Sequence, residues 1–201
     1  GLTPKVDATL GVKPIPALCY GPKSDAALLA ALGRRFDAVA TVKAGAMIFA
    51  PIGSGRTASG QTLPTISIDR SETSNFDFGR AQRGQYDGAS ADWHDKAAAK
   101  RKTVQVGHSG TGQPKRLRKL YASQADAKQA AQAEHSRIER GKATMRLTLA
   151  LGRPDLYPER KVTLTGFKPE IDAMSWCISE CVHQMDGQGG LKTQITLDGS
   201  D

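Results

Sequence analysis

The chain has 201 residues, 39% of them hydrophobic, and carries a formal net charge of +8. This length and composition are typical of a folded protein with one or two small domains and exclude a disordered one. The longest apolar run, Ala26–Leu32, is far shorter than the ~20 residues of a membrane-spanning helix, and no secretory signal opens the sequence. Because the first residue is Gly1 rather than Met, we expect a fragment or a processed chain.

The positive charge is concentrated in one segment. From Lys96 to Arg146 there are 13 basic residues against three acidic ones, a net charge of +10 that leaves −2 for the rest of the chain. Such a segment is typical of a surface that binds polyanions or docks an acidic protein partner. Tyr121 is its only aromatic residue, and no known nucleic-acid-binding motif accompanies it.

The first 80 residues predict a helix and several strands. Ser24 and Asp25 are N-cap residues in front of an amphipathic helix over 26–36, which Gly33 interrupts near its end. Strands are expected over 39–42, 46–49 and 62–68. The glycine-rich loop Gly53–Gly60 lacks the Lys-Ser/Thr ending of a phosphate loop and precedes a strand, so we interpret it as a hairpin loop.

Strands and one helix are also expected further along the chain. Strands are indicated over 85–93 and 103–106, with a loop over 107–115. Ser123 and Asp126 resemble a capping box that opens an alanine-rich helix over about 123–140. Because its apolar face consists mainly of alanines, we expect this helix on the surface.

The clearest pattern follows this helix. Apolar and polar residues alternate with a period of two over 143–151, and the pattern returns three more times before the C-terminus. The residues expected to share one core are Leu147, Leu149, Val162, Leu164, Trp176, Ile178 and Ile195. The predicted fold class is α+β, mainly β: a small α+β domain with an extended N-terminal segment over 1–83, then an antiparallel β-barrel with one inserted helix over 84–201.

Three residues near the C-terminus have side chains typical of soft metal ligands: Cys177, Cys181 and His183. On a strand, Cys177 and Cys181 lie about 13 Å apart at ~3.3 Å per residue, too far for a disulfide or a shared zinc ion. We therefore expect both thiols to point to one side of a strand as packing residues. His183 follows them without completing a ligand set.

Two further segments lack the partners that catalysis requires. Gly107–Thr111 has no glycine at the fifth position of a nucleophile elbow, so it is interpreted as a polar loop. Asp92–Asp95 concentrates polar groups at a strand end, where a turn is the commoner explanation. The sequence therefore predicts no catalytic residue, no cofactor and no metal site.

A resemblance emerges from the order of short motifs along the chain. They are Ser24–Leu32, Lys43–Phe49, Ser59–Pro64, Gly152–Pro154, Val162–Phe167, Trp176–Ile178, His183 and Gly189–Thr193. In this order they resemble the phage late control D family over nearly the whole chain, and they correspond to the later part of a full-length member.

The resemblance implies a non-enzymatic baseplate hub subunit of a contractile phage tail or tail-like particle. It further implies a virion location, a homo-trimeric ring of tandem barrels, and contacts with the tail tube protein and the central spike protein. Two alternatives remain: a polyanion- or nucleic-acid-binding module that uses the basic segment 96–146, and a hydrolase tethered to a tail that would act on peptidoglycan.

The candidate protein-docking residues are Lys115, Arg116, Arg118 and Lys119. They form the densest part of the basic segment, and charge of this kind steers docking and sets orientation. We expect them to meet another tail protein or a neighbouring copy of the chain.

Overall fold

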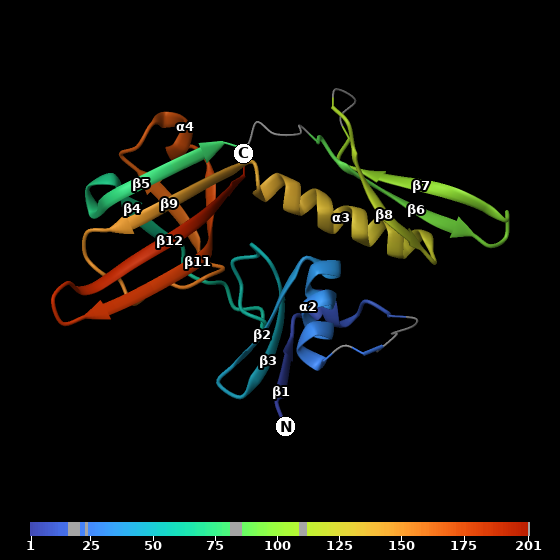
Figure 1. Cartoon of the computed structure of the whole chain (residues 1–201), viewed down its shortest axis with the longest axis horizontal. Helices are drawn as coiled ribbons and strands as arrows, with labels where there is room; N and C mark the ends of the chain where they lie inside the picture. The colour runs from blue at the N-terminus through green and yellow to red at the C-terminus, as the bar shows by residue number, and fades with distance from the viewer. Residues whose placement is uncertain (16–20, 23, 81–85, 109–111, 201) are drawn as a thin grey trace. The chain divides into compact units, whose positions relative to one another are not determined.

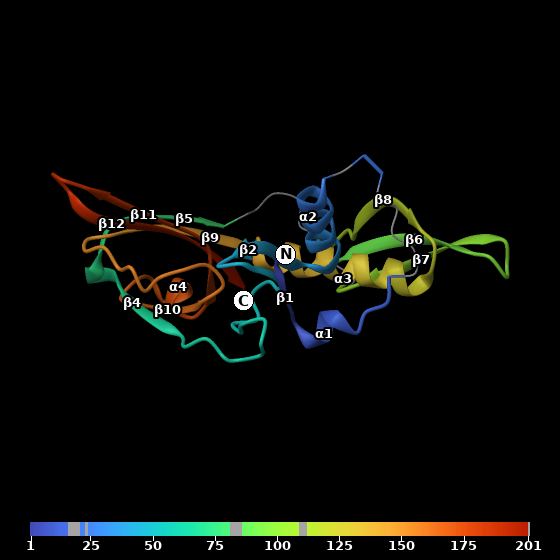
Figure 2. The same ribbon diagram turned by 90° about the horizontal axis from the view of Figure 1, so that it is seen from below.

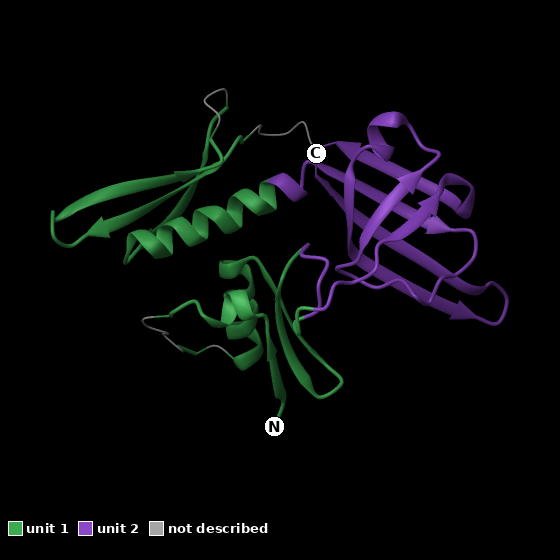
Figure 3. Cartoon of the chain, turned by 180° about the vertical axis from the view of Figure 1, so that it is seen from behind, with its two compact units in different colours: residues 1–52, 58–60, 83–138 green, residues 53–57, 61–82, 139–201 purple. Residues whose placement is uncertain are grey.

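The computed structural model describes residues 1–15, 21–22, 24–80, 86–108 and 112–200. The chain divides into two compact units, which Figure 3 shows in different colours. The first unit contains residues 1–52, 58–60 and 83–138, and the second contains residues 53–57, 61–82 and 139–201.

The N-terminal part of the first unit is a three-stranded sheet with the order β1-β3-β2. Its elements in chain order are β1 (Thr3–Val6), α1 (Ala8–Gly11), α2 (Asp25–Phe36), β2 (Ala38–Lys43) and β3 (Ala46–Pro51). β1 runs parallel to β3, whereas β2 and β3 form an antiparallel hairpin. The helix and the hairpin strands expected from the sequence are confirmed.

Small residues shape this hairpin and the packing of α2. Ala44 and Gly45 have φ angles of 48° and 73°, the left-handed pair that a tight two-residue hairpin turn requires. Gly33 is buried within α2, where a Cβ atom would lie 2.7 Å from the carbonyl oxygen of Ala38. The sequence suggested that Gly33 interrupts the helix, and this was wrong, because α2 continues through it to Phe36. Gly33 instead allows the helix to pack closely on β2.

The other sheet of the first unit has the order β7-β6-β8. Its strands are β6 (Ala89–Asp95), β7 (Lys100–Val106) and β8 (Lys115–Tyr121). β7 is antiparallel and β8 parallel to β6. The helix α3 (Gln124–Arg140), the yellow helix of Figure 1, follows β8 and confirms the helix expected over 123–140.

α3 packs against this sheet. Ala127 and Ala131 of the helix are buried together with Ala89 and Ala91 of β6. The expectation of a surface helix was wrong, because the alanines of α3 meet alanines on the strand, and small side chains on both sides let the two backbones approach. A helix face made of alanines can therefore pack on a sheet when the facing side chains of the strand are also alanines.

The second unit contains a six-stranded sheet with the order β4-β10-β11-β12-β9-β5. Its strands are β4 (Ile66–Asp69), β5 (Thr73–Arg80), β9 (Ala143–Leu149), β10 (Lys161–Thr165), β11 (Ser175–Asp186) and β12 (Gly190–Ser200), with a 3-10 turn η1 (Arg70–Glu72) and a short helix α4 (Pro169–Asp172). All neighbouring pairs are antiparallel except β4 and β10. The sheet curls into a half-barrel, with β9 and β12 in one layer and β4 and β10 in the other (Figure 2). The mainly-β α+β class is confirmed.

The core of the half-barrel agrees with the sequence pattern. All seven residues expected to share a core belong to one buried cluster, which also includes Ile68, Met145 and Leu197. Trp176 lies inside it with its Nε1–H donating to the carbonyl oxygen of Ile171 at 2.9 Å. The loop Gly53–Gly60 turns back locally, with Leu63 N–H donating to the carbonyl oxygen of Gly55 at 2.8 Å. The expectation of a hairpin loop was wrong, because the strands before and after it, β3 and β4, belong to different sheets.

The expected relation between the two cysteines was wrong. A β-bulge in β11 between Ile178 and Glu180 shifts the register against β12. Cys177 is paired with Asp198, whereas Cys181 is paired with Ile195 and packs against the core cluster. The extra residue moves everything after it to the opposite face, so the thiols point to different sides and Val182 is exposed.

The strands expected over 85–93 and 103–106 were predicted to belong to the barrel, and this was wrong. They correspond to β6 and β7, which form the separate sheet β7-β6-β8. The boundary expected between residues 83 and 84 lies outside the described residues, as do Ser109–Thr111 of the predicted polar loop. Two domains over 1–83 and 84–201 therefore stay a prediction. Among the described residues, no helix has the length and apolar character needed to cross a membrane.

Candidate docking surface

The four candidate docking residues all lie on β8, but the structure does not bring them together. Lys115 turns toward α3, where its Nζ donates to Oε1 of the buried Glu134 at 2.5 Å. Arg116 donates to the Asp92 carboxylate instead. Arg118 and Lys119 are exposed and make no ion pair within the described part of the chain.

Strand alternation separates Lys115 from Arg116, and a register shift follows them along β8. Lys115 and Arg116 are paired with consecutive residues of β6, so they belong to opposite faces of the sheet. The next pair joins Leu120 to Asp92, so β8 advances four residues where β6 advances two. Arg118 and Lys119 occupy the bulge created by these extra residues.

Asp92 is the centre of a charge cluster on the face of the sheet opposite α3. Its side chain is fully buried, and its Oδ2 accepts from Nε of Arg101 at 3.0 Å and from Nε and Nη2 of Arg116 at 3.1 and 2.7 Å. Nη2 of Arg101 also donates to Oδ2, and the Thr103 hydroxyl donates to Oδ1 at 2.7 Å. The Thr103 hydrogen bond and the two guanidinium groups hold the pKa of this carboxyl far below its usual range.

This cluster was missed in the sequence, where Asp92 was assigned to a turn at a strand end. In the structure Asp92 lies within β6, and Asp95 at the end of the strand accepts from the turn N–H groups of Ala97 and Ala98. The arginine partners are 9 and 24 residues away in the chain. No local spacing rule joins residues that only strand register brings together.

Acidic partners therefore offset a large part of the basic segment. Glu134 accepts from both Lys115 and Arg137, Asp95 pairs with Lys102 at 2.6 Å, and Asp92 pairs with two arginines. Within the described part of the chain, the exposed Arg118 and Lys119 at the bulge of β8 make no ion pair, and neither do four other exposed basic residues of the segment: Lys96, Lys100, Lys128 and Arg146.

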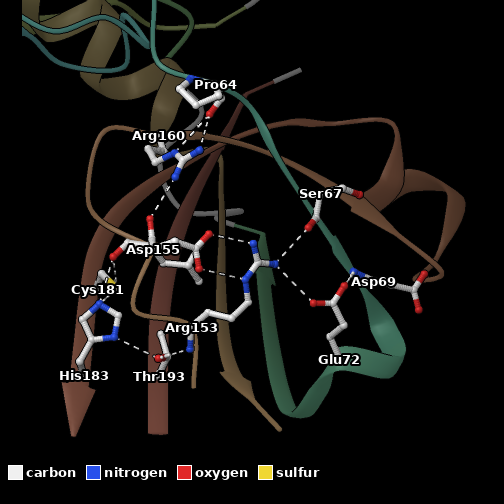
Figure 4. A network of polar contacts seen from close by, with 11 residues as sticks. Pro64, Ser67, Asp69, Glu72, Arg153, Asp155, Arg160, Cys181, His183 and Thr193 are labelled. Atoms are coloured by element: carbon white, nitrogen blue, oxygen red, sulfur yellow. Dashed lines mark hydrogen bonds and ion pairs between the residues drawn. The ribbon is translucent and has the colours of Figure 1, made fainter. Parts of the chain in front are cut away.

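In the second unit, the Gly152–Pro154 motif belongs to a structural network (Figure 4). The Arg153 guanidinium donates to the Asp155 carboxylate at 3.3 and 3.0 Å, to the Ser67 carbonyl oxygen at 3.4 Å, and to Glu72 at 3.4 Å. The hydrogen-bonded ion pair between them raises the pKa of Arg153 and lowers the pKa of Asp155. These contacts tie the loop after β9 to β4 and η1.

The same loop is tied to the β11–β12 hairpin through a histidine. The backbone N–H of Arg153 donates to Thr193 Oγ1 at 2.9 Å, and Thr193 Oγ1 lies 3.0 Å from His183 Nδ1. His183 Nε2 lies 3.0 Å from the Leu156 carbonyl oxygen, which can only accept. Nε2 therefore carries the proton, and Nδ1 accepts from the Thr193 hydroxyl.

Arg160 completes the network. Its guanidinium is buried and donates to the carbonyl oxygens of Pro64 at 3.2 and 2.9 Å and of Asp155 at 3.0 Å. The side chains of Arg153, Arg160 and His183 are all hydrogen-bonded to groups within the fold (Figure 4). The network therefore holds loops in place rather than presenting a reactive group.

The cysteines lack the environment of a reactive thiol. Burial, with smaller contributions from Glu159 and Asp198, raises the pKa of Cys177 to about 12, and burial also raises the pKa of Cys181. Both are free thiols. Within the part of the chain that the structure describes, no three His, Cys, Asp or Glu side chains are grouped to hold a metal ion.

Comparison with solved structures defines the class of fold. The 43 kDa tail protein of prophage MuSo2 from Shewanella oneidensis is similar with a TM-score of 0.66 and 15% identity, over 98% of this chain and 61% of that chain. A tail protein from Neisseria meningitidis MC58 is similar with a TM-score of 0.62 and 11% identity, over 90% of this chain and 57% of that chain. The fold is that of phage tail proteins.

Sequence comparison then defines the family. Residues 23–189 match the family model of the phage tail baseplate hub (GPD). The probable baseplate hub proteins of Escherichia phages 186 and P2 are 33% and 31% identical, over 98% and 94% of this chain and 61% and 58% of their own lengths. The chain belongs to the phage tail baseplate hub family.

The chain thus spans about 60% of the length of these curated relatives. The alignment with the phage 186 protein covers 238 positions, more than the 201 residues of the chain, so the relative carries additional residues within the aligned stretch. The resemblance to the late control D family is confirmed. These comparisons do not support the alternative of a polyanion-binding module.

Proposed function

We propose that the chain acts as a structural subunit of the baseplate hub in a contractile phage tail or tail-like particle. The observation that carries this proposal is the family match over residues 23–189, together with the 33% identity to a probable baseplate hub protein over 98% of the chain. The half-barrel supports the proposal, because its motif residues serve to hold the fold together.

The role is mechanical rather than enzymatic. The polar network around Arg153 and His183 is satisfied within the fold, and the raised thiol pKa values of Cys177 and Cys181 leave them protonated at neutral pH. Both observations favour a protein that assembles over one that catalyses. Turnover of peptidoglycan by the purified chain would contradict this part of the proposal.

In the assembled particle, three copies form a ring that joins the tail tube protein to the central spike protein. The ring adapts the six-fold symmetry of the tube to the three-fold symmetry of the spike. Light scattering on the full-length protein measures the mass of the assembly directly, and a mass other than that of three subunits would contradict the trimer.

The basic residues of β8 contribute to docking with a neighbouring tail protein. Arg118 and Lys119 fit this role because they are exposed at a bulge, whereas Lys115 and Arg116 have partners inside the unit. Replacing all four by Glu would therefore disturb the fold as well as the surface. Arg118→Glu with Lys119→Glu tests docking alone.

The decisive experiment is complementation of tail assembly by this double variant. We expect soluble, folded protein that fails to support complete tails, because reversed charge repels the partner surface. The matched control is Lys100→Glu, at an exposed residue of β7 away from the β8 bulge, which should assemble normally. Normal assembly of the double variant would contradict the docking role.

A further inference from the structure

The face of the β7-β6-β8 sheet opposite α3 has an unusual arrangement of charge. Strand register places Asp92 and Leu120 on this face, flanked by Thr103 of β7. The Asp92 carboxylate is fully buried, whereas the side chains of Arg101 and Arg116 that bind it are 56% and 64% exposed. The carboxylate lies beneath two guanidinium groups that face outward.

The shared carboxylate brings the two guanidinium groups together. Both arginines donate through Nε and Nη2 to the same oxygen, Oδ2 of Asp92. A guanidinium has five N–H donors, so each arginine retains donors that Asp92 does not use. The described residues provide no other acceptor for them, and the three groups together carry a net charge of +1.

Such a pair is prepared to bind a second carboxylate. The contacts to Asp92 fix the two side chains in place, so binding an anion costs less side-chain entropy than at a free arginine. Paired N–H groups of a guanidinium match the two oxygens of a carboxylate in a bidentate contact. One further negative charge would leave the cluster electrically neutral.

The composition of this face favours a protein over a nucleic acid. The aromatic residues of the sheet, Trp93 and Tyr121, pack on the side of α3, so they provide no stacking surface for bases here. Leu120 is instead 50% exposed beside the arginines. Arginine next to exposed apolar area is typical of a protein–protein interface.

We propose that Arg101 and Arg116, held by Asp92, form a binding site for an Asp or Glu side chain of an acidic protein partner. The site deepens the proposed function, since it names the chemistry by which the β7-β6-β8 sheet would recognise a neighbouring tail protein. Arg118 and Lys119 at the bulge attract the partner over distance, whereas the arginine pair sets its register.

The test is titration of the full chain with a peptide of six glutamates, observed through the Nε–H resonances of Arg101 and Arg116 by NMR. We expect both resonances to shift and saturate together. Arg116→Lys keeps the charge but loses the paired donors, and we expect ~10-fold weaker binding. The matched control Arg118→Lys removes a guanidinium outside the pair and should change the affinity less than ~2-fold.

Arg101→Lys repeats the test at the second arginine in case Arg116→Lys lowers the melting temperature. Equal losses in the 116 and 118 variants, or no saturation in the unmodified chain, would overturn the site. Tighter binding of a six-nucleotide single-stranded DNA or of inorganic phosphate than of the peptide would also overturn it. None of these results bears on the family role, which particle assembly tests separately.

Discussion

The two main sheets of the chain are stabilised in opposite ways. The half-barrel buries large side chains such as Trp176, Met145 and Leu197 in one continuous core. The β7-β6-β8 sheet buries alanines against α3 and compensates with charge, placing Asp92 on one face and Glu134 on the other beneath basic side chains.

This difference follows from burial per residue. An alanine buries a single methyl group, whereas a large aliphatic side chain contributes ~1.5–3 kcal/mol when it is fully buried. The β7-β6-β8 sheet, which buries alanines against α3 and is called the alanine-rich sheet below, therefore depends on hydrogen-bonded ion pairs. The strength of these ion pairs varies with pH. The half-barrel depends mainly on apolar packing, which does not. Four predictions test this comparison.

The largest effect is expected for Trp176→Ala in the half-barrel. Trp176 is 2% exposed, and its ring packs edge-to-face with that of Phe78 at a centroid distance of 6.3 Å. Its Nε1–H also donates a hydrogen bond to the carbonyl oxygen of Ile171. Its truncation should cost ~3–5 kcal/mol and give insoluble or molten protein. Thermal unfolding measures the loss, and an unchanged melting temperature would show that Trp176 contributes little to the core.

Asp92→Asn should destabilise the alanine-rich sheet less, by ~1–3 kcal/mol, because the exposed arginines regain water when they lose their partner. Hydrogen exchange should increase in β6, β7 and β8 while the half-barrel stays protected. Asp95→Asn, at the end of β6, is the control. Equal exchange changes in both sheets would refute the separate stabilisation.

Acid should weaken the same sheet first. The folded-state pKa of Asp92 lies below that of the unfolded chain, so its stabilising contribution is complete above the unfolded value of ~4 and is lost as pH falls toward the folded value. Urea unfolding followed from pH 7 to pH 3 should show the alanine-rich sheet losing stability before the half-barrel, and Asp92→Asn should flatten this dependence. The reverse order of loss would contradict the comparison.

The smallest effect on stability is expected for Arg118→Glu with Lys119→Glu, below ~1 kcal/mol, since exposed charges contribute little. Lys115→Glu should cost more, because it places a second carboxylate against the buried Glu134. Urea midpoints of the two variants give the order directly. A larger loss for the bulge variant would show that Arg118 or Lys119 has a structural role.

Local patterns in the sequence determined most of the elements. The N-cap at Ser24, the helix that begins after Ser123 and the alternation from Ala143 to Leu149 all depend on residues within a few positions of each other. The core of the half-barrel could be predicted for the same reason, since a period of two marks the buried side of a strand. The family followed from the order of these motifs.

The tertiary structure alone decided which faces the functional side chains share. The bulge at Ser179 separated Cys177 from Cys181. Asp92 acquired its arginines because β7 and β8 both pair with β6. Register and bulges arise from pairing between distant strands, and one extra residue reverses every side chain after it, so no local pattern contains this information.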